Sequence, residues 1–337
     1  MTLSLNDLLS ERQTLLADGA LGTNFFAMGL EAGEAPELWN LTAPDEVRRL
    51  HQSFVDAGSD LILTNSFGGT ASRLKLHDAE NRVSEINRAA AKLAREVSDK
   101  APRPVLVAGS LGPTGELFAP LGTLEPEQGR ELFRAQAEAL VEGGVHLLWI
   151  ETLSSAEELR AAVAGAAGLG LPIVATLSFD SNGRTMMGIA PEDWIALQEQ
   201  LSAPLYAYGA NCGAGLNELV AAMLAIRQAA PPNAILIGKG NCGIPRYEDG
   251  RILYDGTPEL MADYTRLLSA LSVQIIGGCC GTTARHIAAM RQALDKASFE
   301  PVPDLTTIEA RLGALNRSNP DLNASPAQSK RRRRQRR

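Results

Sequence analysis

The sequence has no apolar run near the roughly 18 residues that a membrane-spanning helix needs. Its opening stretch, MTLSLNDLLSERQTLLADG, lacks the basic and then apolar pattern of a signal peptide. We therefore expect a cytoplasmic protein with no membrane partner. With 45% hydrophobic and 21% charged residues, the composition excludes a disordered chain, a collagen and a coiled coil. A length of 337 residues suits two domains, or one α/β barrel of roughly 250 residues with additions.

Basic residues are scarce outside the end of the chain. The last eight residues, KRRRRQRR, hold seven of the 32 Lys and Arg residues, while the whole chain has 39 Asp and Glu. The remainder is therefore acidic, which disfavours binding to a phosphate backbone. Because the basic block follows a polar stretch, we expect residues 323–337 to be a solvated, disordered tail, and we expect no nucleic-acid partner for the rest.

Cysteine is also scarce. The chain has four, Cys212, Cys242, Cys279 and Cys280, all in the last part of the sequence and two of them adjacent. In a chain without a signal peptide, such clustering indicates metal binding or thiol chemistry more than a disulfide framework.

Short apolar runs alternate with amphipathic helical patterns along the chain. Eight strands are predicted, at 15–20, 60–67, 104–112, 146–152, 172–179, 205–212, 234–242 and 273–280. Helices are predicted within 44–58, 79–99, 125–144, 155–170 and 216–230, and residues 21–43 are expected to form a long loop. Apolar strands joined by helices indicate a parallel sheet, and eight such units favour a (β/α)₈ TIM barrel over a doubly wound sheet. We place this α/β barrel at 13–298, as a single domain with a C-terminal extension at 299–322.

In such a barrel the active site lies at the carboxyl ends of the strands. All four cysteines fall at predicted strand ends, together with Asp18, Asn65 and Glu151. Thiolates are preferred ligands of zinc, so we expect Zn²⁺ as the cofactor. Cys279 and Cys280 both bind if the glycines around them let the strand end bend, and spacing leaves the third ligand open between Cys212 and Cys242.

Three thiolate ligands leave one position of a tetrahedral zinc open, as in catalytic sites. The histidines do not supply a ligand at the other strand ends, since His51, His77 and His286 lie in or near helices and His146 opens a strand. We expect these histidines to be helix-surface or strand-start residues. An electron-rich zinc activates water weakly but can hold a substrate thiol as a thiolate, which predicts a small thiol substrate.

The strand-end motifs resemble those of the zinc-dependent homocysteine S-methyltransferase family over residues 13–296. The matching motifs are DGALGT at 18–23, TNSF at 64–67, GSLGP at 109–113, ET at 151–152, GANC at 209–212 and GGCCGT at 277–282. The last two together are the most specific. The loop containing APELWN and the segments 68–76 and 178–188 are most similar to bacterial betaine-homocysteine S-methyltransferases.

This resemblance implies an enzyme that transfers a methyl group to L-homocysteine, with catalysis through zinc on Cys212, Cys279 and Cys280. It implies that Cys242, where relatives more often carry Ala, packs near the site without binding the metal. It further implies that Asp18 and Glu151 receive the homocysteine ammonium, while backbone amides near Gly19 and Ala20 meet its carboxylate.

Two further residues are candidates for substrate binding. Asn65 either orients a polar group of the substrate or ties the rim together. Trp39, in the first long loop, either presents an aromatic face to a cationic methyl donor or anchors the loop by packing. Glycine betaine is the expected donor, and S-methylmethionine, S-adenosylmethionine or a separate methyl-corrinoid protein are the alternatives. A homo-oligomer is compatible with the sequence.

Other functions explain fewer of the residues at the predicted strand ends. A thiol redox protein would cycle Cys279 and Cys280 as a disulfide, and a protein that only binds metal would need no substrate residues. An aldolase or isomerase would need a strand-end lysine or acid–base pair, for which Lys239 is the lone lysine available.

Overall fold

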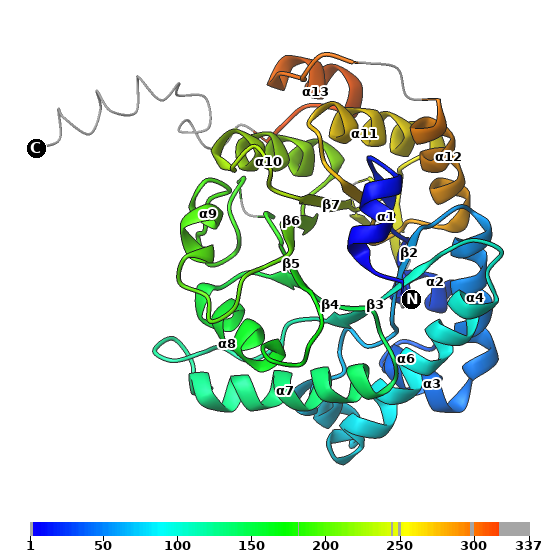
Figure 1. Cartoon of the computed structure of the whole chain (residues 1–337), viewed down its shortest axis with the longest axis vertical. Helices are drawn as coiled ribbons and strands as arrows, with labels where there is room; N and C mark the ends of the chain where they lie inside the picture. Colours follow the sequence, from blue (N-terminus) through cyan, green and yellow to red (C-terminus); the bar gives the residue numbers. More distant parts are fainter. Residues whose placement is uncertain (1–2, 181, 244, 249–250, 297–299, 317–337) are drawn as a thin grey trace, which may run out of the picture.

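The computed structural model describes residues 3–180, 182–243, 245–248, 251–296 and 300–316. It contains one parallel sheet of eight strands in the order β1-β10-β7-β6-β5-β4-β3-β2. The strands are β1 (Leu15–Leu16), β2 (Leu61–Leu63), β3 (Leu106–Leu111), β4 (Leu147–Leu153), β5 (Ile173–Leu177), β6 (Ala207–Cys212), β7 (Leu236–Gly240) and β10 (Ile275–Gly278). A parallel bridge between Ala17 and Leu61 joins the first and last strands of this order. The predicted (β/α)₈ barrel is therefore confirmed (Figure 1). Seven of its eight strands are shorter than the sequence pattern, and β4 keeps its predicted length but is shifted by one residue.

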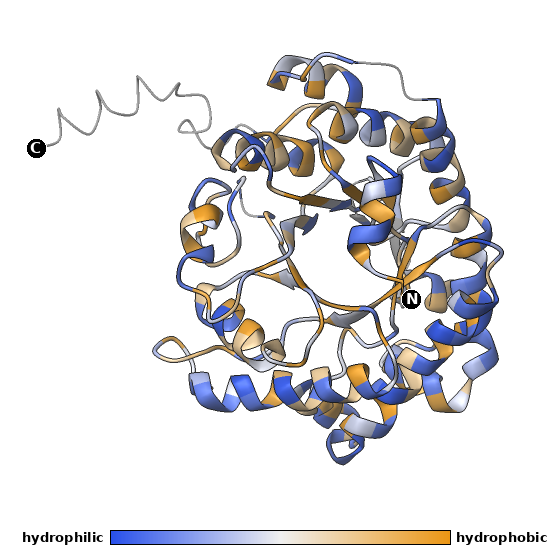
Figure 2. Cartoon of the chain, in the orientation of Figure 1, coloured by the Kyte–Doolittle hydropathy of each residue, from blue (hydrophilic) through white to orange (hydrophobic). Residues whose placement is uncertain are grey.

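The five predicted helices are present as α4 (Pro44–Asp56), α6 (Val83–Lys100), α7 (Pro126–Glu142), α8 (Ala156–Ala166) and α10 (Leu216–Ala229). Two more complete the ring, α11 (Pro258–Ala270) and α12 (Ala284–Asp295). Their apolar faces turn toward the strands and their polar faces outward (Figure 2). Prolines at the first turns of α4, α7 and α11 fit the helix start, where a missing N–H costs nothing.

The remaining elements are short. They are η2 (Lys75–His77), η3 (Glu80–Arg82), α5 (Ala71–Leu74), α9 (Asp193–Gln198) and a hairpin of β8 (Pro245–Glu248) with β9 (Arg251–Tyr254). The hairpin lies in the connection between β7 and α11, next to the carboxyl end of β7. One side chain of this hairpin, Tyr254, takes part in the candidate site.

The expectation of a plain loop at 21–43 is wrong. This segment contains α2 (Gly22–Ala27), the single-turn η1 (Pro36–Leu38) and α3 (Trp39–Thr42). These elements lack the sustained apolar period of the longer helices and are held by tertiary contacts instead. Asn40 is buried and donates to the Asn65 carbonyl oxygen over 2.8 Å.

The amino end of the barrel is closed by α1 (Leu5–Glu11), which precedes the predicted barrel. Its Ser4 cap and Asp7 form a capping box, and Leu5 and Leu8 are buried. They belong to one apolar cluster with the first residues of the strands, including Leu15, Leu61 and Leu147. In Figure 1 this helix lies inside the ring of outer helices, near β2.

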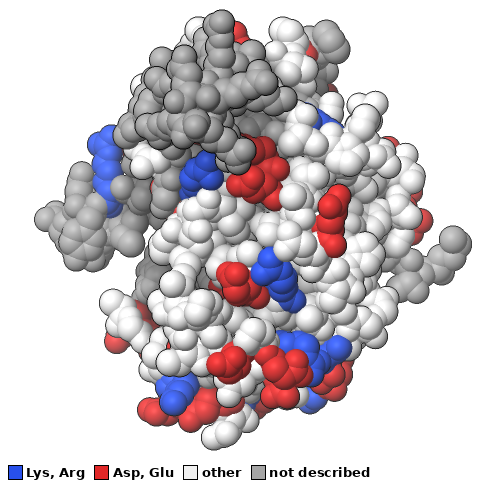
Figure 3. Space-filling model, turned by 90° about the vertical axis from the view of Figure 1, so that its left-hand side faces the viewer, with Lys and Arg blue, Asp and Glu red and all other residues white. Residues whose placement is uncertain are grey.

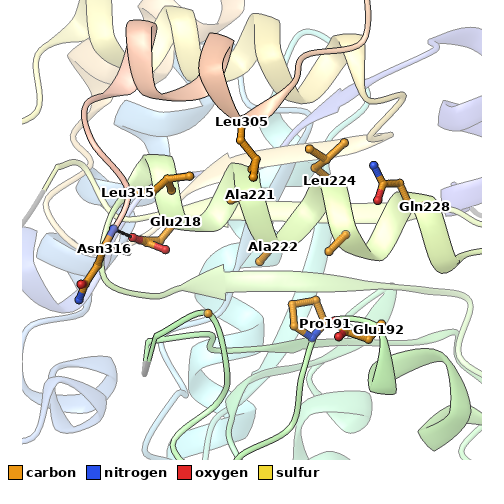
Figure 4. A pocket seen from close by; sticks show the side chains of 12 residues that line it. Pro191, Glu192, Glu218, Ala221, Ala222, Leu224, Gln228, Leu305, Leu315 and Asn316 are labelled. Atoms are coloured by element: carbon orange, nitrogen blue, oxygen red, sulfur yellow. Dashed lines mark hydrogen bonds between the residues drawn. The ribbon is translucent and has the colours of Figure 1, made fainter. Parts of the chain in front are cut away.

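The C-terminal part of the described chain packs on the outside of the barrel. Helix α13 (Leu305–Leu312) contacts α10 and α11. Asn217 donates to the Ala314 carbonyl oxygen over 2.7 Å, and Glu218 accepts from the Asn316 amide over 2.6 Å. Between α13, α10 and the segment around Pro191 lies a cavity of about 220 Å³ (Figure 4). The predicted tail at 323–337 lies outside the described residues.

The surface carries mixed charge where it is drawn in Figure 3, with acidic and basic side chains side by side along one edge. Many form ion pairs one helical turn apart, such as Arg130 with Glu127 and Arg266 with Asp263. Among the described helices, none combines the length and the apolar character required to cross a bilayer.

Candidate metal and substrate site

Three cysteines meet at the carboxyl end of the barrel. Cys212 is the last residue of β6, and Cys279 and Cys280 follow β10. Their three Sγ atoms lie within 4.8 Å of one another. Within the described part of the chain, they form the group of side chains that is placed to hold a metal ion. Three soft thiol donors, from the ends of the two strands that flank β7, suit zinc.

Backbone geometry explains how these side chains converge. Cys212 has a φ of 60°, in the left-handed region that non-glycine residues rarely adopt. After β10 the chain turns at Gly281, whose φ is 79°, so Cys279 and Cys280 no longer alternate as they would in a strand. A Cβ at Gly281 would lie 2.3 Å from Cγ of Tyr254, so this turn also needs glycine to fit beneath the tyrosine ring.

Two asparagines hold the thiol-bearing strand ends in place. Asn241 Oδ1 accepts from the Cys212 thiol over 3.3 Å and from the Cys280 amide over 3.1 Å, and its Nδ2 donates to the Gly213 carbonyl oxygen. Asn211 donates through Nδ2 to the Thr152 hydroxyl over 2.7 Å and contacts Cys279 Sγ at 3.9 Å. The position of the thiols therefore rests on side chains from β6 and the end of β7.

The three thiols share hydrogen bonds, and their acidities differ as a result. Hydrogen bonds from Cys212 and Cys279, and a weaker one from the Tyr254 hydroxyl, lower the pKa of Cys280. The hydrogen bonds to Cys279 and Cys280 raise the pKa of Cys212. In this arrangement one sulfur is stabilised as a thiolate by neighbouring thiol and hydroxyl donors. A soft cation that binds the three sulfur atoms would displace the protons of the other two thiols.

Cys242 lies outside this cluster. Its side chain is 1% exposed, and its thiol faces the Gly256 carbonyl oxygen at 3.4 Å. Burial raises the pKa of Cys242 to about 12. Its amide donates to the Cys280 carbonyl oxygen over 2.8 Å, so it supports the turn through its backbone.

Below the thiols, the barrel holds three charged side chains. Asp18 is 0% exposed, and its Oδ1 lies 3.0 Å from Lys239 Nζ while its Oδ2 accepts from the Leu63 amide over 2.8 Å. Burial disfavours charge on Lys239, but the negative charges of Asp18, Glu151 and Cys279 outweigh it and raise the pKa of the lysine. The lysine therefore remains a cation inside the barrel.

Glu151 stands beside this pair and is held more loosely. It is 7% exposed, and Ser110 donates a short hydrogen bond to its Oε1. Burial raises the pKa of Glu151 to about 7, opposed by the charge of Lys239. A substrate cation placed against this carboxylate would favour its ionised form.

The segment after β1 fits tightly against the segment after β10. A Cβ at Gly19 would lie 2.6 Å from the Thr282 carbonyl oxygen and 2.8 Å from the Phe54 ring, so only glycine fits. The Ala20 amide donates to the Thr282 carbonyl oxygen over 3.1 Å. The Ala20 N–H is therefore bonded within the protein rather than facing a substrate carboxylate.

A family model for homocysteine S-methyltransferases matches residues 15–294, which includes every strand of the barrel. The chain belongs to the homocysteine S-methyltransferase family. Among curated proteins, it is 28% identical over 321 residues to the methionine synthase of Mycobacterium tuberculosis, covering 88% of this chain and 26% of that protein. It is 27% identical to the methionine synthase of Mycobacterium leprae, covering 25% of that protein. The chain thus spans about a quarter of the length of these relatives.

Solved structures agree with this membership. The metallated form of the homocysteine methyltransferase MmuM from Escherichia coli matches with a TM-score of 0.71 and 25% identity, covering 86% of this chain and 99% of that one. The oxidized form of the same protein matches with a TM-score of 0.70 and 26% identity over the same shares.

Two residues predicted to bind substrate, Asn65 and Trp39, contact other residues at the carboxyl-end rim of the barrel. Asn65 Nδ2 donates to the Pro36 carbonyl oxygen over 2.7 Å and to Asn40 Oδ1 over 3.0 Å, so its amide ties β2 to the first loop. Trp39 is half-buried, with its ring centroid 5.3 Å from that of Phe25. Both contacts favour the anchoring alternative for these side chains.

Several residues of the site had no predicted role. Lys239 was predicted only as a lone strand-end lysine, Ser110 and Asn211 lie in strand-end motifs, and Asn241 lies near the end of a predicted strand. Their position at strand ends was the available signal. Tyr254 gave no such signal, because it reaches Cys280 from the hairpin that follows β7.

One expectation about the histidines is wrong. His51 is fully buried on α4 and has no hydrogen-bond partner at either ring nitrogen, so it is not a helix-surface residue. His146, as expected, stands at a strand start, where its Nδ1 accepts from the Val107 amide over 2.8 Å.

Proposed function

We propose that this protein transfers a methyl group to the sulfur of L-homocysteine and forms methionine, with zinc as cofactor and glycine betaine as donor. The observation that carries the proposal is the cluster of Cys212, Cys279 and Cys280 at the catalytic end of a barrel from the homocysteine S-methyltransferase family. MmuM, which matches over 99% of its own chain, is named a homocysteine methyltransferase.

The donor set fits zinc. The three thiols are close enough to bind one ion, and hydrogen bonds already stabilise Cys280 as a thiolate. A zinc ion held by Cys212, Cys279 and Cys280 would supply a fourth position in which the homocysteine sulfur is kept as a thiolate. Asn241 and Asn211 keep the strand ends at the spacing this requires.

The charged residues below the thiols suit the amino group of homocysteine. Glu151, beside Asp18, provides a carboxylate for the substrate ammonium, with Ser110 fixing one oxygen. Gly19, next to Asp18, lets the segment after β10 pack closely against this wall of the site. With the amino group held there and the sulfur among the thiols, the sulfur attacks the methyl carbon of the donor in line. A carbon–sulfur bond forms as the carbon–nitrogen bond of betaine breaks, leaving dimethylglycine.

The choice of donor rests on sequence similarity alone. The segments at 68–76 and 178–188 and the loop around Trp39 resemble those of bacterial betaine-homocysteine methyltransferases. Trp39 packs on Phe25, so an aromatic cage for the donor would need the outer face of this ring. S-methylmethionine, S-adenosylmethionine and a methyl-corrinoid protein remain the alternative donors.

The proposal is tested by measuring methionine formation from homocysteine by zinc-loaded protein, with each donor in a separate reaction. Turnover with betaine and not with S-methylmethionine or S-adenosylmethionine supports the full proposal. Turnover with one of the latter replaces the donor and keeps the acceptor. Absence of methionine with every donor, including a methylated corrinoid protein, would contradict the acceptor as well.

A second measurement separates this function from thiol redox chemistry. Zinc that remains at one ion per chain after gel filtration, together with three thiols that are protected from alkylation until the metal is removed, is the expected result. A Cys279–Cys280 disulfide that forms and breaks reversibly with substrate would favour the redox alternative.

A further inference from the structure

The two carboxylates of the site, Asp18 and Glu151, differ in how many of their oxygen atoms already have a hydrogen-bond partner within the protein. Both oxygens of Asp18 have partners, Lys239 on one and the Leu63 amide on the other. Among the described residues, the one hydrogen bond to the Glu151 side chain comes from Ser110. Asp18 is also the more deeply buried of the two, at 0% against 7% exposed. The pair is therefore not symmetric toward an incoming ammonium group.

The side chain of Lys239 occupies space that is free because the residue opposite it on β10 is a glycine. Opposite the lysine in the register of β7 and β10 stands Gly277, where a Cβ would lie 2.8 Å from Cγ of Lys239. The Nζ atom lies 6.0 Å from the centre of the Trp149 ring, and the lysine is 3% exposed. A buried lysine is costly unless its charge is compensated, and here the Asp18 carboxylate, 3.0 Å from Nζ, compensates it.

We infer that Lys239 is a positioning residue of the homocysteine site, which occupies Asp18 and thereby leaves Glu151 as the carboxylate that binds the substrate ammonium. This inference rests on the proposed function. Asp18 then acts as the fixed support of Lys239, and the charge of Lys239 keeps two neighbouring buried carboxylates from repelling each other.

A contribution to folding stability does not by itself explain the buried ion pair of Lys239 and Asp18. Buried ion pairs are often matched or exceeded in stability by apolar side chains of similar volume. The amino end of the same barrel is in fact filled by leucines, alanines and isoleucines. A lysine at the carboxyl end, next to the thiols, indicates a role in substrate binding.

The first test is steady-state kinetics of Lys239→Met with homocysteine varied. We expect KM for homocysteine to rise at least about tenfold, because Asp18 loses its counter-ion and Glu151 its neighbouring cation, while kcat changes by less than about threefold. Zinc content should stay at the wild-type value. Lys92→Met, the same change at an exposed lysine of α6, is the matched control. An unchanged KM in a folded K239M protein would overturn the inference.

A double-variant cycle tests whether Lys239 acts through Asp18. In Asp18→Asn/Lys239→Met neither buried charge is left unpaired, so this protein should fold even if K239M does not. We expect its KM to be no higher than that of D18N alone, because the two residues form one unit. A KM raised by the product of the two single effects would show that Lys239 touches the substrate independently.

A third comparison needs no change at Lys239. Glu151→Gln should raise the calorimetric Kd for homocysteine at least about tenfold more than D18N, because Glu151 is the binding carboxylate. Equal losses in the two variants would contradict the asymmetry. Failure of the wild type to bind homocysteine or form methionine would contradict the proposed function itself, an outcome distinct from wild-type turnover with unaltered variants.

Discussion

The strands of the barrel begin among leucines and end among acids, amides and thiols. At the amino end, Leu15, Leu61 and Leu147 pack under α1 in one apolar cluster. At the carboxyl end, the same strands deliver Asp18 and Glu151, and two others deliver the cysteines. The difference shows that one end serves packing while the other holds buried polar groups whose hydrogen-bond partners come from other strand ends. Substitutions at the two ends should therefore have different consequences.

The largest expected effect is at the thiol cluster. Cys212→Ala should lower methionine formation by more than about 100-fold, since one of three ligands is lost. Zinc bound per chain, measured after gel filtration, should fall as well. Cys242→Ala is the matched control: it removes a buried thiol outside the cluster, so zinc content and activity should stay near the wild-type values. Equal loss of zinc in both variants would place Cys242 among the ligands.

A second prediction concerns the ring of helices between the two ends. Burial lowers the pKa of His51 to about 4, so the folded protein holds this side chain neutral while the unfolded chain protonates near 6.5. The stability contributed by this group is present above pH 6.5 and is lost as pH falls toward 4, by up to about 3 kcal/mol.

The measurement is denaturant unfolding at several pH values. The slope of unfolding free energy against pH over this range should be smaller in His51→Leu than in the wild type, by the amount that corresponds to one bound proton. Some pH dependence should remain, because the pKa of His146 is also lowered to about 4. A slope identical to that of the wild type would show that His51 is not held neutral.

The amino end should respond in stability alone. Leu8→Ala in α1 removes a side chain that is 2% exposed, which should cost about 2 to 3 kcal/mol of unfolding free energy through the cavity left behind. KM and kcat should be unchanged, because the strand starts lie away from the thiols. Urea unfolding and the methionine assay check the two statements, and a large loss of activity in folded L8A would break the division between the ends.

The smallest effect is expected where the C-terminal segment meets the barrel. Asn217→Ala removes the hydrogen bonds to the carbonyl oxygens of Gly313 and Ala314, worth about 1 kcal/mol of unfolding free energy. Thermal unfolding should detect a small drop in Tm and the activity should be unaltered. A change in KM would connect this outer segment to the site.

Much of this protein follows from local pattern. Eight apolar strands alternating with helical segments dictate a parallel barrel, because both faces of such a sheet must be covered. That architecture gathers strand ends on one rim, so all four cysteines could be predicted to lie there from their positions alone, with the third metal ligand open between Cys212 and Cys242. Family motifs then chose among the candidate ligands.

The remaining features depend on contacts between residues far apart in the chain. The short helices at 21–43 form because Asn40 and Asn65 bond across the rim, and α1 is helical against strand starts from all around the barrel. The role of Lys239 is of the same kind, since 221 positions separate it from Asp18. Sequence shows which residue types stand at strand ends, whereas the charge that each one faces is set by the closed barrel, which brings the side chains of Asp18 and Lys239 within hydrogen-bonding distance.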